Sequence, residues 1–324
     1  MAIKALAWMV RVFEPPVYCY HEIVHNRLVV DRFRQLGVVF VDDVGEVPDG
    51  APVMLSAHGS APEVVAQARA KGGVVVDAVC PLVTKVHHEL KVRAGKGYTV
   101  LYVGHEGHDE AVGTMAVAPQ SVRLVERERD LEAIADPGTP VALLAQTTLS
   151  QHDWQGILEA ARDRFPDLWM PNRSDLCFAT TNRQDALASI ASRADSVIVI
   201  GSANSSNTVA LTKVAKDSGC ARVHRVNCVD EVPDDLTGVV GVTAGASAPE
   251  ELVEAVVAKL APTQGVEAVD VTTEDEYFPP PPELRRLLEG VTAALAAAFG
   301  AARAEPLADD RSVAASDVLA RLRS

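Results

Sequence analysis

The sequence predicts an α/β protein made of three similar parallel-sheet modules, and three observations lead to this prediction. Apolar residues make up 48% of the 324 residues but aromatic residues only 5%, so the interior must consist of Val, Ala, Leu and Ile, the usual filling of buried parallel strands and their helices. Short Val- and Ile-rich runs alternate with longer helical patterns, as in successive βαβ units. The chain is also too long for one ordinary domain.

The predicted strands recur along most of the chain. They cover residues 38–44, 53–56, 74–79, 99–104, 141–145, 197–201, 222–226 and 239–243. Several end in small polar or histidine-containing loops, with the sequences SAHGS, GHEGH, AQTTLS, GSANSSN and TAGAS. Ligands gather at the carboxyl ends of the strands in open parallel sheets, so we expect the functional site at these loops.

An internal echo supports repeated strand-loop-helix units. The tetrapeptide Ser-Ala-Pro-Glu occurs at 60–63 and again at 247–250. Each copy follows a predicted strand and a glycine, and each is predicted to open a helix with its serine as the cap. We expect modules at 1–80, 81–175 and 176–262, then a segment at 263–285 that returns to the core and an Ala-rich helical or disordered tail at 286–324.

Charge and composition exclude several classes of protein. The chain has 44 Asp and Glu against 30 Lys and Arg, a net charge of -14, which repels nucleic acid and anionic membranes. No apolar run is long enough to span a bilayer, and the apolar start has no signal-peptide cleavage site. We therefore expect a cytoplasmic protein, in which five scattered cysteines are thiols rather than a disulfide framework.

The string HEIVH at 21–25 matches the H-E-x-x-H pattern of zinc hydrolases. In that pattern two histidines one helical turn apart bind the metal. The residues just before the string are strand-like, and no third ligand follows at the usual spacing. Zinc hydrolysis is therefore the minor alternative.

The strand-end loops contain groups suited to a small anion. His58, His105, His108 and Glu110 lie in two of them, and a cluster of imidazoles would donate hydrogen bonds to a polyanion, although a single loop histidine is usually only solvated. The run at 201–207 lies between a strand and a helix, where backbone N–H groups and hydroxyls favour phosphate. Simple helix capping would explain one of these polar residues but not the cluster.

Cys80 and Cys177 stand at a strand end and a helix start. Positive helix ends lower the pKa of a thiol, which suits iron or zinc binding better than a packed interior does. The alternative is that both are buried thiols. Cys220 and Cys228 flank a short strand and are interpreted as structural.

Eight motifs, taken in order, closely resemble the 4-hydroxy-3-methylbut-2-enyl diphosphate reductase family, also called IspH or LytB. They are HEIVHN (21–26), SAHG (56–59), DAVCPLVTKVH (77–87), GHEGHDE (104–110), QTTLS (146–150), LCFATTNRQ (176–184), NSSN (204–207) and GVTAGASAP (241–249). The resemblance spans about residues 1–285. It implies three α/β modules in a pseudo-threefold trefoil around a central cavity.

The resemblance also implies a [4Fe-4S] cluster held by three cysteines. Cys80 and Cys177 match the second and third ligands, and Cys19 matches none. The first ligand belongs to a G-F-C-x-G-V motif that would precede Met1, and MAIKAL looks like its continuation. We expect translation to have been assigned to an internal methionine; otherwise the chain is a cluster-deficient homologue that still binds diphosphate.

The implied activity is reductive dehydroxylation of (E)-4-hydroxy-3-methylbut-2-enyl diphosphate to isopentenyl and dimethylallyl diphosphate, the last step of the methylerythritol phosphate (non-mevalonate) pathway. By resemblance Glu110 directs protonation of the leaving oxygen, and Thr147 binds the allylic hydroxyl with it. The implied electron donor is ferredoxin or flavodoxin. The diphosphate would be bound by His25, His58, His108, Ser205, Ser206, Asn207 and Ser247.

Overall fold

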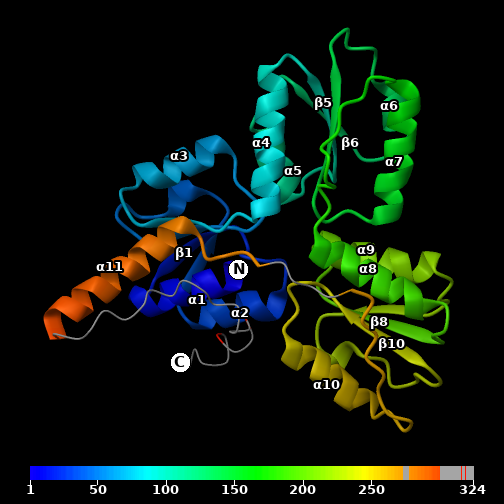
Figure 1. The fold of residues 1–324 in the computed structure, drawn as a ribbon. Helices are drawn as coiled ribbons and strands as arrows, with labels where there is room; N and C mark the ends of the chain where they lie inside the picture. The colour runs from blue at the N-terminus through cyan, green and yellow to red at the C-terminus, as the bar shows by residue number, and fades with distance from the viewer. Residues whose placement is uncertain (273–276, 300–314, 316–317, 319–324) are drawn as a thin grey trace. The chain divides into compact units, whose positions relative to one another are not determined.

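The computed structural model describes residues 1–272, 277–299, 315 and 318 (Figure 1). In this part of the chain the strands form three sheets, and every strand pair is parallel. The predicted parallel-sheet α/β fold class is therefore confirmed. Among the described residues, no helix is both long and apolar enough to cross a bilayer.

Two compact units make up the chain, and each is described by itself. The first contains residues 1–24, 30–81 and the described residues after 276; the second contains 25–29 and 82–272. The chain leaves the first unit near Cys80, where α4 begins. The module boundaries expected at 80, 175 and 262 remain a prediction.

The first unit contains a four-stranded sheet of order β2-β1-β3-β4. Its core is aliphatic and includes the fully buried Val53, Leu55 and Ala68, as the composition predicts. Its strands are β1 (Val17–Tyr20), β2 (Val38–Val41), β3 (Val53–Leu55) and β4 (Val75–Asp77), with helices α1 (Ala2–Val12), α3 (Pro62–Ala70) and α11 (Pro282–Phe299) and the short η1 (Val44–Glu46). Helix α2 (Arg27–Gln35) connects β1 to β2 along the chain.

The second unit contains two three-stranded sheets, of orders β6-β5-β7 and β10-β8-β9. The first sheet has β5 (Thr99–Val103), β6 (Val122–Val125) and β7 (Val141–Ala145), with α4 (Pro81–Gly95), α5 (Asp109–Met115), α6 (Asp130–Ala133) and α7 (Gln151–Arg164). The second has β8 (Ser196–Ile200), β9 (Val223–Val226) and β10 (Val240–Ala244), with α8 (Phe178–Ala191), α9 (Ser206–Asp217), α10 (Glu250–Leu260) and the short η2 (Val229–Glu231).

The three sheets share one topology that fixes where the polar loops lie. In each sheet the strand that comes first in sequence is central and lies between the second and third strands. Because all strands are parallel, the loops after the first and third strands leave the same edge side by side. The loops after β5 and β7 are therefore neighbours, as are the loops after β8 and β10.

The serine caps expected from the Ser-Ala-Pro-Glu echo are wrong. The N-cap of α3 is Ala61 and that of α10 is Pro249, and neither helix has a side-chain cap. A residue that precedes proline is pushed out of the helical conformation. Each helix therefore starts too late for Ser60 or Ser247 to reach its first amides.

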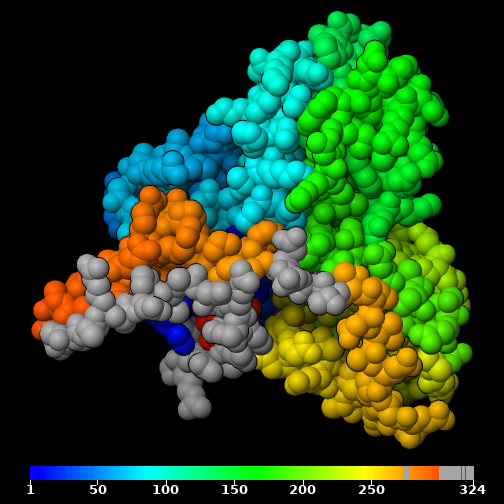
Figure 2. All heavy atoms as spheres, viewed as in Figure 1, coloured from blue at the N-terminus to red at the C-terminus, as the bar shows by residue number. Residues whose placement is uncertain are grey.

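The remaining differences lie at β6 and in the tail. The strand β6 (Val122–Val125) is not among the predicted strands, and it has one exposed and one half-buried residue among its four. The helix α11, which is orange in Figure 2, extends into the expected tail. Its Val291 and Leu295 are exposed. The rest of the tail, apart from 315 and 318, lies outside the described residues.

Candidate active site

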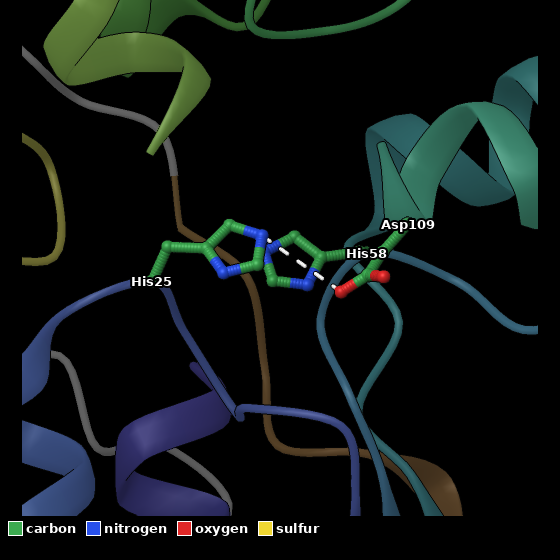
Figure 3. Close-up of side chains that lie close together, drawn as sticks. All are labelled: His25, His58 and Asp109. Carbon is green, nitrogen blue, oxygen red and sulfur yellow. Dashed lines mark ion pairs between the residues drawn. The ribbon is translucent and has the colours of Figure 1, made fainter. Parts of the chain in front are cut away.

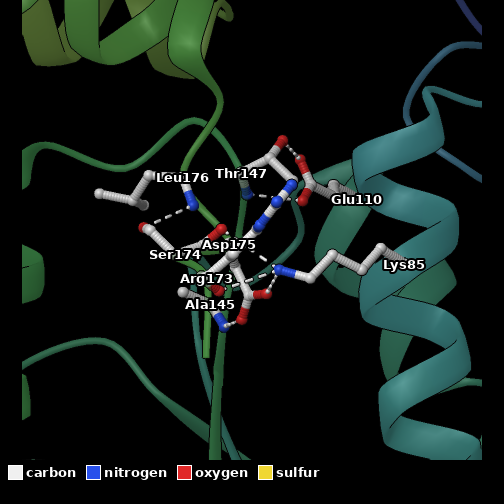
Figure 4. Close-up of polar contacts among 8 residues, drawn as sticks. All are labelled: Lys85, Glu110, Ala145, Thr147, Arg173, Ser174, Asp175 and Leu176. Atoms are coloured by element: carbon white, nitrogen blue, oxygen red, sulfur yellow. Dashed lines mark hydrogen bonds and ion pairs between the residues drawn. The ribbon is translucent and has the colours of Figure 1, made fainter. Parts of the chain in front are cut away.

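The carboxyl group of Glu110 is the most deeply buried acid of the predicted site. Glu110 lies in the first turn of α5 and is 1% exposed. The N–H of Thr147 donates to Oε1 at 2.7 Å, and the Thr147 hydroxyl lies 2.9 Å from Oε2 (Figure 4). Burial raises the pKa of Glu110 to about 7, although both hydrogen bonds lower it in part. The acid is therefore poised to gain or lose a proton at neutral pH.

His108 is held as a neutral hydrogen-bond donor beside this acid. It is the N-cap of α5, and its Nδ1 accepts the N–H of Glu110 at 3.2 Å. Burial, and then the nearby His25, lower its pKa to about 4. Because Nδ1 accepts, the single ring proton of the neutral form must lie on Nε2.

His25 connects loops of both sheets of the second unit. Its Nε2 lies 3.8 Å from Oδ2 of Asp109 (Figure 3), and its ring lies edge-on to His108 at 5.6 Å. On the other side, its Nδ1 is 3.5 Å from Nδ2 of Asn204. The Ser247 hydroxyl donates to the carbonyl of His25 at 3.3 Å. Ser247 thus contacts this segment rather than capping a helix.

The start of α9 has the features of an anion site. Ser205 is the N-cap, and its hydroxyl accepts the N–H of Thr208 at 3.3 Å. Asn207 in the first turn is only 5% exposed, and its buried Oδ1 and Nδ2 have no hydrogen-bond partner within the described chain. A buried unpaired amide is rare and costly. Because the N-terminal end of a helix carries a partial positive charge, the unpaired amide of Asn207 is suited to bind an anionic ligand there.

Gly201, which directly follows β8 (Ser196–Ile200), lets the chain turn tightly at this point. Its φ is 150°, and a Cβ there would collide with the side chain of Thr208. Only glycine therefore places the loop 202–205 close against α9.

Gln146 is a residue of the site to which the sequence analysis assigned no role. Its side chain is fully buried, and Oε1 accepts the N–H of His105 at 3.0 Å. Its Nε2 donates to the hydroxyls of Ser206 at 3.1 Å and Thr148 at 2.9 Å. It thereby joins the loop after β5 to the start of α9. The available signal was a long polar side chain directly after a fully buried strand.

Cys177 caps the N-terminus of α8, and its N–H donates to the carbonyl of Thr147 at 2.8 Å. Burial raises the pKa of its thiol, while the amides of Ala179 and Thr180 lower it in part. The expected lowering by the helix end is present but is the smaller effect. Cys177 is thus next to the residue that binds Glu110.

The other cysteines differ in their surroundings. Cys80 directly precedes the first residue of α4, and its N–H donates to the carbonyl of Ala57. Cys19 is fully buried in β1, and burial raises the pKa of its thiol far above the ordinary value. Cys220 is buried, with its thiol near two carbonyls. A helix-end position suits a metal thiolate, so Cys80 and Cys177 fit that role and Cys19 does not.

The H-E-x-x-H helix on which the zinc alternative rests is not formed by residues 21–26. Residues 21–26 form no helix, and His21 has a positive φ of 57°. The two histidines of HEIVH are therefore not one helical turn apart.

The predicted site residues are divided between the two units. Cys80, a predicted cluster ligand, and His58, a predicted diphosphate ligand, belong to the first unit, and the other predicted site residues belong to the second.

Comparison with known proteins gives consistent results. The family model described as LytB protein matches residues 1–261. The 4-hydroxy-3-methylbut-2-enyl diphosphate reductase of Rhodopirellula baltica is 45% identical over 88% of this chain and 91% of its own length. The reductase of the same name from Acidothermus cellulolyticus is 44% identical over 98% of this chain and 91% of its own.

Solved structures agree with the sequence relatives. The E-1-hydroxy-2-methyl-but-2-enyl-4-diphosphate reductase from Plasmodium falciparum matches with a TM-score of 0.86 and 30% identity, over 90% of this chain and 93% of that one. A structure described as (E)-4-hydroxy-3-methyl-but-2-enyl diphosphate reductase, the terminal enzyme of the non-mevalonate pathway, matches with a TM-score of 0.58 and 29% identity. This match covers 80% of this chain and 93% of that one.

Proposed function

This chain belongs to the LytB family, and we propose from that premise that it reduces (E)-4-hydroxy-3-methylbut-2-enyl diphosphate to isopentenyl and dimethylallyl diphosphate. The reaction replaces an allylic hydroxyl by hydrogen. It consumes two electrons and two protons and releases water. The chain must therefore hold an anionic substrate, deliver a proton to the leaving oxygen and exclude bulk water from the reacting end.

The observation that carries the proposal is the buried pair of Glu110 and Thr147. The backbone N–H of Thr147 can only donate, so Oε1 of Glu110 must accept. In the structure the Thr147 hydroxyl donates to Oε2. A proton gained by the acid therefore belongs on Oε2, and this hydrogen bond then reverses, so that Oε2 donates to the Thr147 hydroxyl. That hydroxyl then has its own proton to offer. The pair can pass a proton to a substrate oxygen, and positioned acids of this kind contribute about 10² to 10⁴ in rate.

The diphosphate is assigned to the polar groups at the strand ends. Asn207 offers an unpaired buried amide, and His108 offers an Nε2 proton at neutral pH. Charge-assisted hydrogen bonds contribute about 1.5 to 3 kcal/mol each. The proposed ligands are His25, His58, His108, Ser205, Ser206, Asn207 and Ser247.

Cys80 and Cys177 are the proposed ligands of a [4Fe-4S] cluster. Both stand at helix starts, the donor type and location that suit iron. When bound, the cluster supplies electrons singly and a Lewis-acidic iron for the substrate hydroxyl.

The proposed electron donor is a ferredoxin or flavodoxin, and the proposed location is the cytoplasm. The net charge of -14 disfavours nucleic acid and anionic membranes as partners.

Anaerobic reconstitution with iron and sulfide tests the proposal. We expect the protein to become brown, to bind iron and to convert the substrate to both products with dithionite and a mediator. Cys80→Ser, which removes a proposed cluster ligand, is the matched comparison. Iron-free protein that still binds diphosphate would instead identify a cluster-deficient homologue, and stoichiometric zinc would contradict the proposal altogether.

A further inference from the structure

A buried carboxylate links the loop before α8 to two other elements of the second unit. The side chain of Asp175 is 1% exposed. Its Oδ1 lies 3.1 Å from Nζ of Lys85 in α4, and its Oδ2 accepts the N–H of Ala145, the last residue of β7, at 3.1 Å (Figure 4). Asp175 therefore connects its loop to a helix and to a strand end at once.

Lys85 uses its full donor capacity on this loop. Besides Asp175, its ammonium group donates to the carbonyls of Arg173 at 3.0 Å and Ser174 at 3.2 Å. An ammonium group has three donors, and here all three meet consecutive residues. The Lys85 side chain is 31% exposed, so its charge is only partly shielded by water. These contacts fix the position of the backbone at residues 173 and 174, because two of the three acceptors of Lys85 are main-chain carbonyl groups.

The loop held in this way ends at a proposed cluster ligand. The N–H of Leu176 donates to the hydroxyl of Ser174 at 3.1 Å, and the N–H of Cys177 donates to the carbonyl of Thr147. Each residue from 173 to 177 thus has a polar contact, through its backbone or, for Asp175, through its side chain, to α4, to the loop itself or to the end of β7. The helix α4 begins directly after Cys80, the other proposed ligand in this sequence.

We propose that Lys85 and Asp175 are positioning residues that hold the Cys177 loop in the conformation that binds the cluster. This inference rests on the proposed function. Neither side chain acts on the substrate. Without Lys85, Asp175 becomes a buried unpaired carboxylate, and the loop must rearrange to give it water, which moves the thiol of Cys177 away from its place beside Thr147.

The test measures iron retention together with local backbone opening. Lys85→Met removes the cation but keeps a side chain of similar length. Asp175→Asn keeps the shape of the side chain, but its amide N–H₂ then faces either Nζ of Lys85 or the N–H of Ala145, both of which are donors. The matched control is Arg222→Met, which breaks an exposed ion pair with Asp235 at 2.9 Å in the same unit. We expect both test variants of the reconstituted protein to release iron to a chelator about tenfold faster, as for the loss of one hydrogen bond, and the control to match the parent.

Amide hydrogen exchange of the metal-free protein gives a readout independent of activity. We expect the amides of Leu176 and Cys177 to exchange faster in Lys85→Met, with the β5 and β8 amides unchanged. Lys85→Arg retains a cation that can reach the same acceptors, so it should restore much of the iron retention even if Lys85→Met folds poorly.

Two results would overturn the inference. One is parental iron release in Lys85→Met and Asp175→Asn. The other is a general loss of thermal stability, with equal opening throughout the unit, which would make the pair a structural ion pair only. A parent protein that binds no iron would instead contradict the proposed function. Iron binding by the parent is measured first, so this failure is distinguished from a failure of the inference about Lys85 and Asp175.

Discussion

The loops after β5 and β8 occupy equivalent places in two sheets of the same topology, yet their side chains differ in kind. The β5 loop leads to titratable groups, of which Glu110 has both oxygens engaged by Thr147. The β8 loop leads to uncharged groups, of which Asn207 has both amide atoms unengaged. The same strand-loop-helix topology therefore suits two different tasks. Glu110, whose oxygens already have partners, suits the proposed proton transfer, whereas Asn207, whose amide has no partner within the described chain, suits the proposed binding of an anion.

The largest expected effect comes from replacing Glu110, the proposed proton donor in α5, the helix that follows β5. Glu110→Gln keeps shape and burial but cannot deliver a proton, so we expect turnover to fall by about 10² to 10⁴ with the visible spectrum of the cluster unchanged. Steady-state kinetics and anaerobic absorbance measure this. The matched control is Glu126→Gln, an acid that also accepts a backbone N–H but is exposed. Retained turnover would remove Glu110 from its role.

The titration of Glu110 should also be visible in stability. Its pKa is raised from 4.5 to about 7, so the folded state holds an extra proton between these values. The unfolding free energy from this group is therefore complete below pH 4.5 and is lost as the pH rises through 7, by on the order of 3 kcal/mol. The stability of the parent relative to Glu110→Gln should fall over this range in denaturant titrations, whereas a constant difference would contradict the raised pKa.

Activity should follow the same titration. The acid must be protonated to donate, so kcat should decrease as the pH rises above about 7. The Glu126→Gln control should keep this profile.

On the β8 side the expected effect is smaller and falls on binding. Asn207→Ala removes an amide that has no partner within the described chain, so the unfolding free energy should stay equal or rise slightly. The KM for the diphosphate should rise by about 10- to 100-fold, the equivalent of one charge-assisted hydrogen bond. Asn227→Ala is the control, because that amide already bonds to Glu231. A marked loss of stability with unchanged KM would contradict the anion site.

The smallest effects separate a proposed diphosphate ligand that also caps a helix from one that caps none. Ser205 caps α9, so Ser205→Ala should lower stability by about 1 kcal/mol. Ser247 caps no helix, so Ser247→Ala should change stability by less than about 0.5 kcal/mol and should raise KM. Thermal unfolding with kinetics distinguishes them, and Ser150→Ala, at the α7 cap, is the stability control. Equal loss of stability in both serine variants would contradict this assignment.

Much of the fold was predictable because its signals are local. Fully buried strands such as β7 and β8 appear as unbroken aliphatic runs, and the alternation with helices predicts parallel sheets. The strand β6 escaped because charged neighbours interrupt its short apolar run. The capping error at Ser60 and Ser247 shows that a motif can be outweighed by one proline, whose effect on the preceding residue decides where a helix begins.

The motifs supply the candidate residues of the site but not their contacts. They include Glu110, Thr147 and Asn207, but they do not show that the first two are paired and the third is unpaired. Gln146 and Asp175 received no role because the local sequence does not show what a buried polar side chain contacts. Its importance depends on partners that are 30 or more positions away in sequence.

The sequence by itself determined the fold class, the family and the thiol, acid and hydroxyl groups available for chemistry, because these depend on residue identity and on patterns of neighbouring residues. Only the tertiary structure decided which groups are charged, paired or left open. Burial raises the pKa of Glu110 and lowers that of His108, and burial is a property of the folded environment. Lys85, distant in sequence, likewise acts on the Cys177 loop only because folding brings the two together.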